Sequence, residues 1–290
     1  MAARSIRHPG AASEPRVLAQ ACTARRLTLR FQPGKPVLDA VAEALSSQGI
    51  DSAVIEMDMG SLAPLVYVVP APSPDEAHAA WYSETRRPGG IGQIERLTMS
   101  FGRREGAPFI HCHGIWKHAD GFRGAGHLIP HESAFGAEVE GTVYAISGAI
   151  LDQQADAETN FPLLTPVPSG TLRNEEASAV LLRIKPNTDI HAAIEDVARA
   201  HSFDHATLHG NCSLVGCDFA DGSHMSSYAS EAFLRSSYVK KGKATVDIGV
   251  VGMDGKIFQG IIARGGNVVC IACEILIVQK SKKSAKRIVE

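Results

Sequence analysis

Apolar and polar residues follow the same order of patterns in both halves of the chain. In the first half, Leu27–Phe31 alternates as a half-buried strand does, and Pro36–Gly49 has its apolar residues on one helical face. In the second half, Ala179–Ile184 has strand character and Thr188–His201 has helical spacing. Other predicted strands lie at Ser52–Met59, Leu65–Val69, Ile94–Phe101, Phe109–Trp116, Ala137–Ile146, Ala206–Leu208, Ala232–Ser236, Ala244–Val251 and Val268–Val278. Strands without a regular strand–helix alternation predict an α+β fold.

A constant shift also relates the later parts of the two halves. Asp-Gly occurs at position 120 and again at position 254, a shift of 134 positions, and the same shift places Gly126 on Gly260. We therefore expect two tandem domains of similar structure, each a mainly antiparallel sheet packed with one main helix.

The expected domain bounds follow from the composition of the segment between the two halves and of the two chain ends. Residues 152–177 are polar and contain proline, as linkers do. They separate a first domain at 27–151 from a second at 178–280. Residues 1–26 are predicted to be a basic disordered arm, and residues 281–290 a basic tail.

Composition narrows the function classes. The 290 residues are 44% hydrophobic and 21% charged, which is typical of a folded globular protein. The net charge of −2 is unfavourable for a protein that neutralises phosphates. The apolar runs are shorter than the ~18 residues of a membrane helix, and the N-terminal residues lack the apolar core of a secretory signal. Six scattered cysteines suit free thiols in a reducing compartment, so we expect a cytoplasmic protein without a membrane partner.

Histidines are the strongest chemical signal. Five of the twelve lie between positions 111 and 131. His111 and His113 project from the same face of the predicted strand, and the Asp120-Gly121 turn can return the chain so that His127 lies beside them. Three imidazoles suit a divalent metal, with zinc favoured, and leave a coordination position open for a ligand. A His-x-His pair alone is a weak signal, because core histidines also show this spacing.

This stretch resembles a known family. The run HCHGIWKHADGFRGAGHL, preceded by GQIERLTMSFG and followed by AEVEGTVYAI, resembles the plants-and-prokaryotes conserved (PPC) domain. The resemblance covers about 27–151, and more faintly 179–279. It implies a compact α+β domain, a trimeric assembly and a metal held by three histidines. In the family's plant members the domain is joined to a DNA-binding AT-hook, and many bacterial members are labelled DNA-binding on that basis.

Carried over to this sequence, the resemblance places His111, His113 and His127 in the metal-ligand positions. Glu95 takes the family's acidic position on the preceding strand and is the candidate catalytic residue. It could orient a ligand histidine or a bound water, or it could be a solvated carboxylate on a strand.

The second copy departs from the pattern. The 134-position shift places Thr245, Asp247 and Ile261 where the first copy has its histidines, and Ile261 has no donor atom. We therefore expect a degenerate second domain without a metal. A trimer of such chains would form a pseudo-hexameric arrangement of domains with three metal sites.

Two function classes remain open. The first is a metal-dependent protein that binds a small polar or anionic ligand, with hydrolase or lyase chemistry possible and the reaction not readable from the sequence. The second is a DNA-associated regulator, favoured by the basic ends but opposed by the net charge and by the lack of an AT-hook or helix-turn-helix signal. The Cys270-x-x-Cys273 spacing is interpreted as core packing, since residues i and i+3 of a strand face opposite sides.

Overall fold

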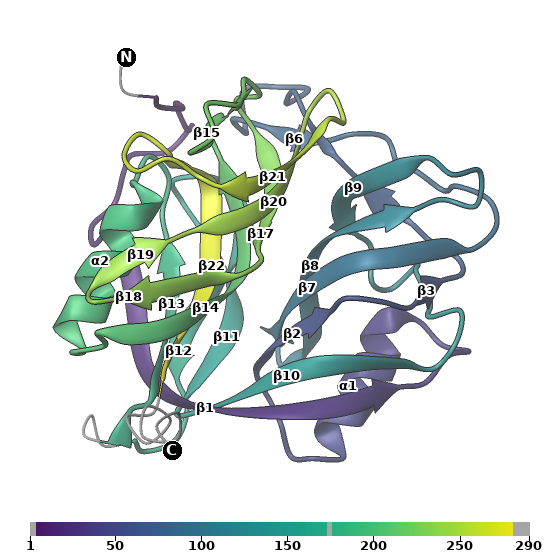
Figure 1. Ribbon diagram of the computed structural model, residues 1–290, viewed down its shortest axis with the longest axis horizontal. Helices are drawn as coiled ribbons and strands as arrows, with labels where there is room; N and C mark the ends of the chain where they lie inside the picture. Colours follow the sequence, from purple (N-terminus) through teal and green to yellow (C-terminus); the bar gives the residue numbers. More distant parts are fainter. Residues whose placement is uncertain (1–3, 173–175, 281–290) are drawn as a thin grey trace, which may run out of the picture.

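Two mainly antiparallel sheets, each with one helix, form the molecule (Figure 1). The computed structural model describes residues 4–172 and 176–280, so the expected tail at 281–290 lies outside the described residues. The helices are α1 (Val37–Ser46) and α2 (Ile190–Ala200). The expected α+β class is confirmed.

The first sheet contains most strands of the N-terminal half. They are β1 (Val17–Phe31), β2 (Ala53–Met57), β3 (Ser61–Leu62), β4 (Tyr67–Val68), β7 (Gly92–Arg104), β8 (Ala107–Lys117), β9 (Arg123–Leu128), β10 (Val139–Ser147), β11 (Ala149–Ala155) and β12 (Pro162–Pro168). A separate two-stranded ribbon joins β5 (Pro70–Ala71) and β6 (Trp81–Tyr82).

The second sheet contains most of the remaining strands. They are β13 (Ala179–Ile184), β14 (His205–Leu214), β17 (Ser230–Leu234), β18 (Ser237–Lys240), β19 (Lys243–Thr245), β20 (Asp247–Gly252), β21 (Ile257–Ile261) and β22 (Val269–Gln279). A short ribbon joins β15 (Cys217–Asp218) and β16 (His224–Met225).

The central strands of the two sheets follow the same order. In the first sheet the neighbours run β1-β10-β2-β7-β8-β9, and in the second they run β13-β22-β14-β17-β20-β21. The closing hairpins match in detail, because Gly121 and Gly255 both adopt positive φ in their turns. One helix follows the first strand of each series, and each helix packs on its own apolar core.

Strand β1 belongs to both sheets. Residues 17–22 pair with β13, and residues 23–31 pair with β10. In Figure 1 this strand runs along the base of the molecule from one sheet to the other. Most of the 1–26 segment is therefore ordered, and the prediction of a disordered arm was wrong. The segment also contributes to the core, because Cys22 is fully buried.

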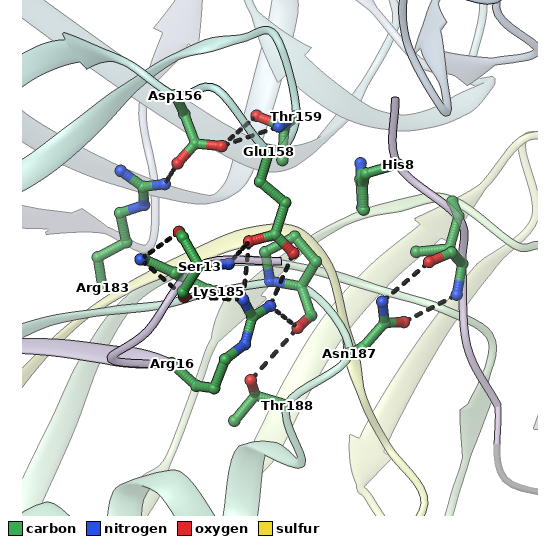
Figure 2. A network of polar contacts seen from close by, with 12 residues as sticks. His8, Ser13, Arg16, Asp156, Glu158, Thr159, Arg183, Lys185, Asn187 and Thr188 are labelled. Atoms are coloured by element: carbon green, nitrogen blue, oxygen red, sulfur yellow. Dashed lines mark hydrogen bonds and ion pairs between the residues drawn. The ribbon is translucent and has the colours of Figure 1, made fainter. Parts of the chain in front are cut away.

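The residues before β1 are held by polar contacts (Figure 2). Arg16 donates two hydrogen bonds to the carboxylate of Glu158, at 2.7 and 2.8 Å. Lys185 donates to the carbonyl and hydroxyl oxygens of Ser13, and the His8 ring lies 2.8 Å from the carbonyl oxygen of Cys270. Arg16, one of the basic residues of the expected arm, is therefore engaged in a contact with a distant segment.

The expected linker is also structured. Residues 152–168 belong largely to a hairpin in which β11 pairs with β12 from Ala149↔Pro168 to Ala155↔Pro162. Leu164 packs in a core shared by both halves, and Asp156 forms a buried ion pair with Arg183 of β13. A polar, proline-containing composition was therefore a poor guide here, because the hairpin buries its few apolar side chains against both sheets. Among the described residues, neither helix has the length and apolar character needed to cross a membrane.

We expect replacement of Arg16 by Met to lower the free energy of unfolding by about 2–3 kcal/mol, because it leaves the carboxylate of Glu158 buried without its partner. The Glu158 side chain is only 3% exposed. Urea denaturation measures the change. Arg87→Met is the matched control, because Arg87 and Glu132 form an exposed ion pair whose loss should cost less than about 1 kcal/mol. Equal effects of the two variants would show that the arm is not anchored as described.

Candidate metal centre

The hairpin of β8 and β9 brings the three predicted histidines together. His113 and His127 are directly paired across the two strands, and His111 lies two residues from His113 on the same face of β8. The ring centroids of His111 and His127 are 5.0 Å apart, and those of His113 and His127 are 5.4 Å apart. Gly126 precedes His127 at a φ of 156°, and a Cβ there would lie 2.2 Å from the carbonyl oxygen of Val68. Glycine therefore allows β9 to approach β4 at the position that sets His127.

The second half of the chain completes this group of donors. A carboxylate oxygen of Glu231, on β17, lies 2.6 Å from Nε2 of His113. Potential ligand atoms of Glu231 and the three histidines all lie within 4.8 Å of one another. A His/Glu cluster of this kind could hold a metal ion.

Hydrogen bonds fix the tautomers of two of the imidazoles. Nδ1–H of His111 donates to Glu274 at 2.9 Å, and Nδ1–H of His113 donates to the carbonyl oxygen of Ala232 at 2.7 Å. With Nδ1 protonated, Nε2 of each ring carries a lone pair, and the two Nε2 atoms face each other at 2.9 Å. Two lone pairs at this distance repel unless a proton or a cation lies between them. Partners on the distal nitrogen are typical of metal-bound histidines, so this donor set fits a metal ion.

The third imidazole differs in its surroundings. Nδ1 of His127 is buried and has no hydrogen-bond partner among the described residues. Burial, followed by the proximity of His111 and His113, lowers the pKa of His127 well below its usual value. The pKa of His111 is raised, because the carboxylates of Glu274 and Glu231 outweigh the effect of burial. A neutral His127 is in the protonation state that binds metals.

A cavity of about 330 Å³ lies beside the cluster. The three histidines, Glu231 and Glu274 line it, together with aromatic residues of the first half and mostly small residues of the second. Its size is at the lower end of the range for small-molecule pockets. The centre is therefore accessible to a small molecule from a space between the two halves.

Glu95, the expected catalytic residue, is not part of this group. It lies at a bulge of β7 between Ile94 and Arg96, and its carboxylate pairs with Arg123 at 2.7 Å. The side chain is 38% exposed, and it does not line the cavity. Glu274, rather than Glu95, is the carboxylate that contacts His111. Glu95 is a partly solvated strand carboxylate, the alternative left open by the sequence.

The corresponding hairpin of the second half lacks the donors. Asp247 pairs with Ile261 across β20 and β21, as His113 pairs with His127 in the first half. Among the described residues, the cluster around His113 is the one group with the geometry of a metal site. The second half contributes to that cluster from β17 and β22 rather than from its own hairpin.

Sequence reasoning missed Glu231 and Glu274. Each had a local signal, since Glu274 is the only charged residue in the apolar run Val268–Val278, and Glu231 directly precedes the predicted strand at 232–236. Glu274 is only 2% exposed. A carboxylate inside a buried strand needs a partner, and this requirement indicates a polar site even where the partner is unknown.

Comparison with known proteins gives structural neighbours only. No family model and no curated protein sequence matches the chain. One similar structure is a metal-containing protein from Archaeoglobus fulgidus, with 23% identity, 50% of this chain and 96% of that chain covered, and a TM-score of 0.41. Another is a PPC protein from Pyrococcus horikoshii, with 18% identity, coverages of 52% and 96%, and a TM-score of 0.41. A third, from Bacteroides thetaiotaomicron, is described as a candidate DNA-binding protein, with 13% identity, coverages of 50% and 96%, and a TM-score of 0.37.

The structural neighbours thus include a PPC protein, the family that the sequence resembles, and each covers about half of the chain.

We expect Glu274→Gln to weaken metal binding about 10- to 100-fold, because the neutral amide supports the His111 imidazole less well than a carboxylate does. Competition titration of Zn²⁺ against a chromophoric chelator measures the affinity. Glu95→Gln is the matched control and should leave it unchanged. A loss of affinity in Glu95→Gln with none in Glu274→Gln would restore the assignment made from the sequence.

Proposed function

We propose that the chain is a tandem PPC-family protein in which residues 27–151 and 178–280 are two related units. The common strand order of the two sheets and the matching turns at Gly121 and Gly255 support this proposal. The first unit keeps the histidine set, and the second is degenerate at the corresponding positions.

The function that the geometry supports best is that of a metal-dependent protein acting on a small molecule. His111, His113 and His127 would hold a divalent ion, with Zn²⁺ proposed because nitrogen ligands dominate the set. The observation that supports this most strongly is the pair of Nε2 atoms that face each other while both Nδ1 atoms are engaged. A divalent ion at such a centre polarises a bound oxygen atom and lowers the pKa of water.

Glu231 is the residue placed to exchange a proton with a bound ligand. Its carboxylate touches His113 and lines the cavity, so a molecule in the cavity can reach both the ligand set and this carboxylate. A carboxylate in this position serves hydrolysis, hydration or elimination equally well. We therefore propose an enzyme of the hydrolase or lyase type, with its active site between the two units.

The DNA-associated alternative has less support. Arg4 and Arg16 of the N-terminal segment are engaged in ion pairs with Asp218 and Glu158, so part of the basic charge of this segment is used within the protein. Arg7, Arg25 and Arg26 of the same segment are exposed. The tail at 281–290 lies outside the described residues. No feature of the described surface favours this second function over the first.

The expected homotrimer and cytoplasmic location stay predictions. A trimer should give, in light scattering, a mass of three times the 30.8 kDa of one chain. A mass of 30.8 kDa would rule out the pseudo-hexameric arrangement of domains, although it would leave the metal centre unaffected, because one chain supplies every donor named above.

We expect the purified wild-type chain to contain about one equivalent of divalent metal, and His113→Ala to contain almost none, because the two remaining imidazoles hold the ion far less tightly. Elemental analysis after dialysis measures the content. His131→Ala is the control, since the side chain of His131 is 68% exposed and should be dispensable. Circular dichroism verifies that the variants fold, and His127→Gln repeats the test from β9. A wild-type chain that stays metal-free after incubation with Zn²⁺ would disprove the proposal.

A further inference from the structure

One wall of the cavity consists of aromatic side chains. Trp81 and Phe161 are stacked, with ring centroids 5.4 Å apart and an interplanar angle of 23°. Tyr82 connects this pair to the metal centre, since its ring lies 5.3 Å from that of His127. Trp81 and Tyr82 keep 38% and 37% of their surface accessible, whereas the other tryptophan, Trp116, is fully buried. Accessible aromatic faces inside a cavity favour a planar, apolar group.

The aromatic wall continues along β8. Phe109 lies two residues before His111, so both side chains project from the same face of the strand, and both line the cavity. A ligand that extends away from the histidines along this wall therefore meets apolar rings. This environment disfavours phosphates, sugars and other strongly hydrated molecules.

The charged residues around the cavity determine whether it favours an anionic or a cationic ligand. Glu231 and Glu274 are the acidic lining residues, and Arg104 is the lining residue with a permanent positive charge. Arg104 is exposed, and the neighbouring Arg103 is the arginine that pairs with Asp152. A divalent ion at the histidines would balance the two carboxylates, and the charge of Arg104 would then leave the cavity with a single positive charge. Without the ion, the cavity would be negative and would repel anions.

We propose that this cavity binds a small aromatic carboxylate. Its ring packs against Trp81 and Phe161, and its carboxylate group faces the metal centre. A cavity of about 330 Å³ limits the molecule to about one or two rings. The inference rests on the proposed metal-binding function, because the ion supplies the positive charge that attracts the carboxylate.

Isothermal titration calorimetry of the Zn²⁺-loaded chain tests the proposal with benzoate as the probe. Acetate has the same charge without the ring, and benzyl alcohol has the ring without the charge. We expect benzoate to bind at least about tenfold more tightly than either, and to change the fluorescence of Trp81. The metal-free chain should not bind benzoate. Metal content is measured separately on each sample.

Two variants locate the bound probe. Trp81→Ala should weaken benzoate binding about tenfold while retaining the metal, because it removes the stacking surface and no donor. Arg104→Gln should weaken benzoate binding several-fold and leave the binding of benzyl alcohol unchanged. Phe122→Ala is the matched control, since Phe122 is 53% exposed and lies outside the cavity.

The results separate the two proposals. A chain that takes up the metal but binds benzoate no better than acetate overturns the ligand assignment alone. The same holds if Trp81→Ala and Phe122→Ala bind benzoate equally well. A chain that takes up no metal overturns the proposed function, and with it this inference.

Discussion

The pairing of β1 with both sheets is the constraint on which the rest of the structure depends. Because one continuous strand is hydrogen-bonded to β13 at its start and to β10 at its end, the two sheets are held side by side at a fixed edge. The face of β8 and β9 then meets β17 and β20, and a small apolar cluster seals this contact: Ile115, Ala125, Phe233 and Val251. The cluster of His111, His113, His127 and Glu231 lies in the same layer, so its geometry depends on the sheet contact as well as on the β8–β9 hairpin.

The two halves of the chain contribute different polar groups to the cluster. The first half supplies three imidazoles, and the second supplies Glu231, Glu274 and the carbonyl oxygen of Ala232. Neither set is favourable alone, since a buried Glu274 without His111 would be an uncompensated charge, and unsupported imidazoles would be free to rotate. The second half therefore contributes to this cluster although its own hairpin has Asp247 and Ile261 where the first half has His113 and His127.

The sequence was a good guide to what local patterns determine. The helix expected at Pro36–Gly49 forms over Val37–Ser46, and the strand expected at Phe109–Trp116 forms over Ala107–Lys117. The convergence of His111, His113 and His127 followed from strand alternation and one turn. Cys270 and Cys273 belong to different apolar clusters, as strand alternation predicts.

What the sequence did not reveal depends on contacts between distant segments. The N-terminal segment was expected to be loose because chain termini usually are, but its order comes from partners such as Glu158, some 140 positions away. Glu231 and Glu274 could not be assigned to the histidines, because the residue pattern of a strand does not indicate which surface of another sheet that strand will contact. Glu95 was favoured over them because a family position was available for it and none for them.

A second polar cluster between the halves explains how the contact at the metal centre is kept in register. Glu56 of the first sheet accepts from Nδ1 of His209 of the second at 2.9 Å and pairs with Arg96 at 3.0 Å, while the ring of Tyr144 stacks on His209 at 3.8 Å. Apolar surfaces alone would tolerate small slips between the sheets. The hydrogen bond between His209 and Glu56 penalises such slips, because a displaced sheet would break it while the Glu56–Arg96 pair within the first sheet stays intact. The alignment that satisfies Glu56 is also the one that brings Glu231 to His113, so the register of the interface and the geometry of the centre are fixed together.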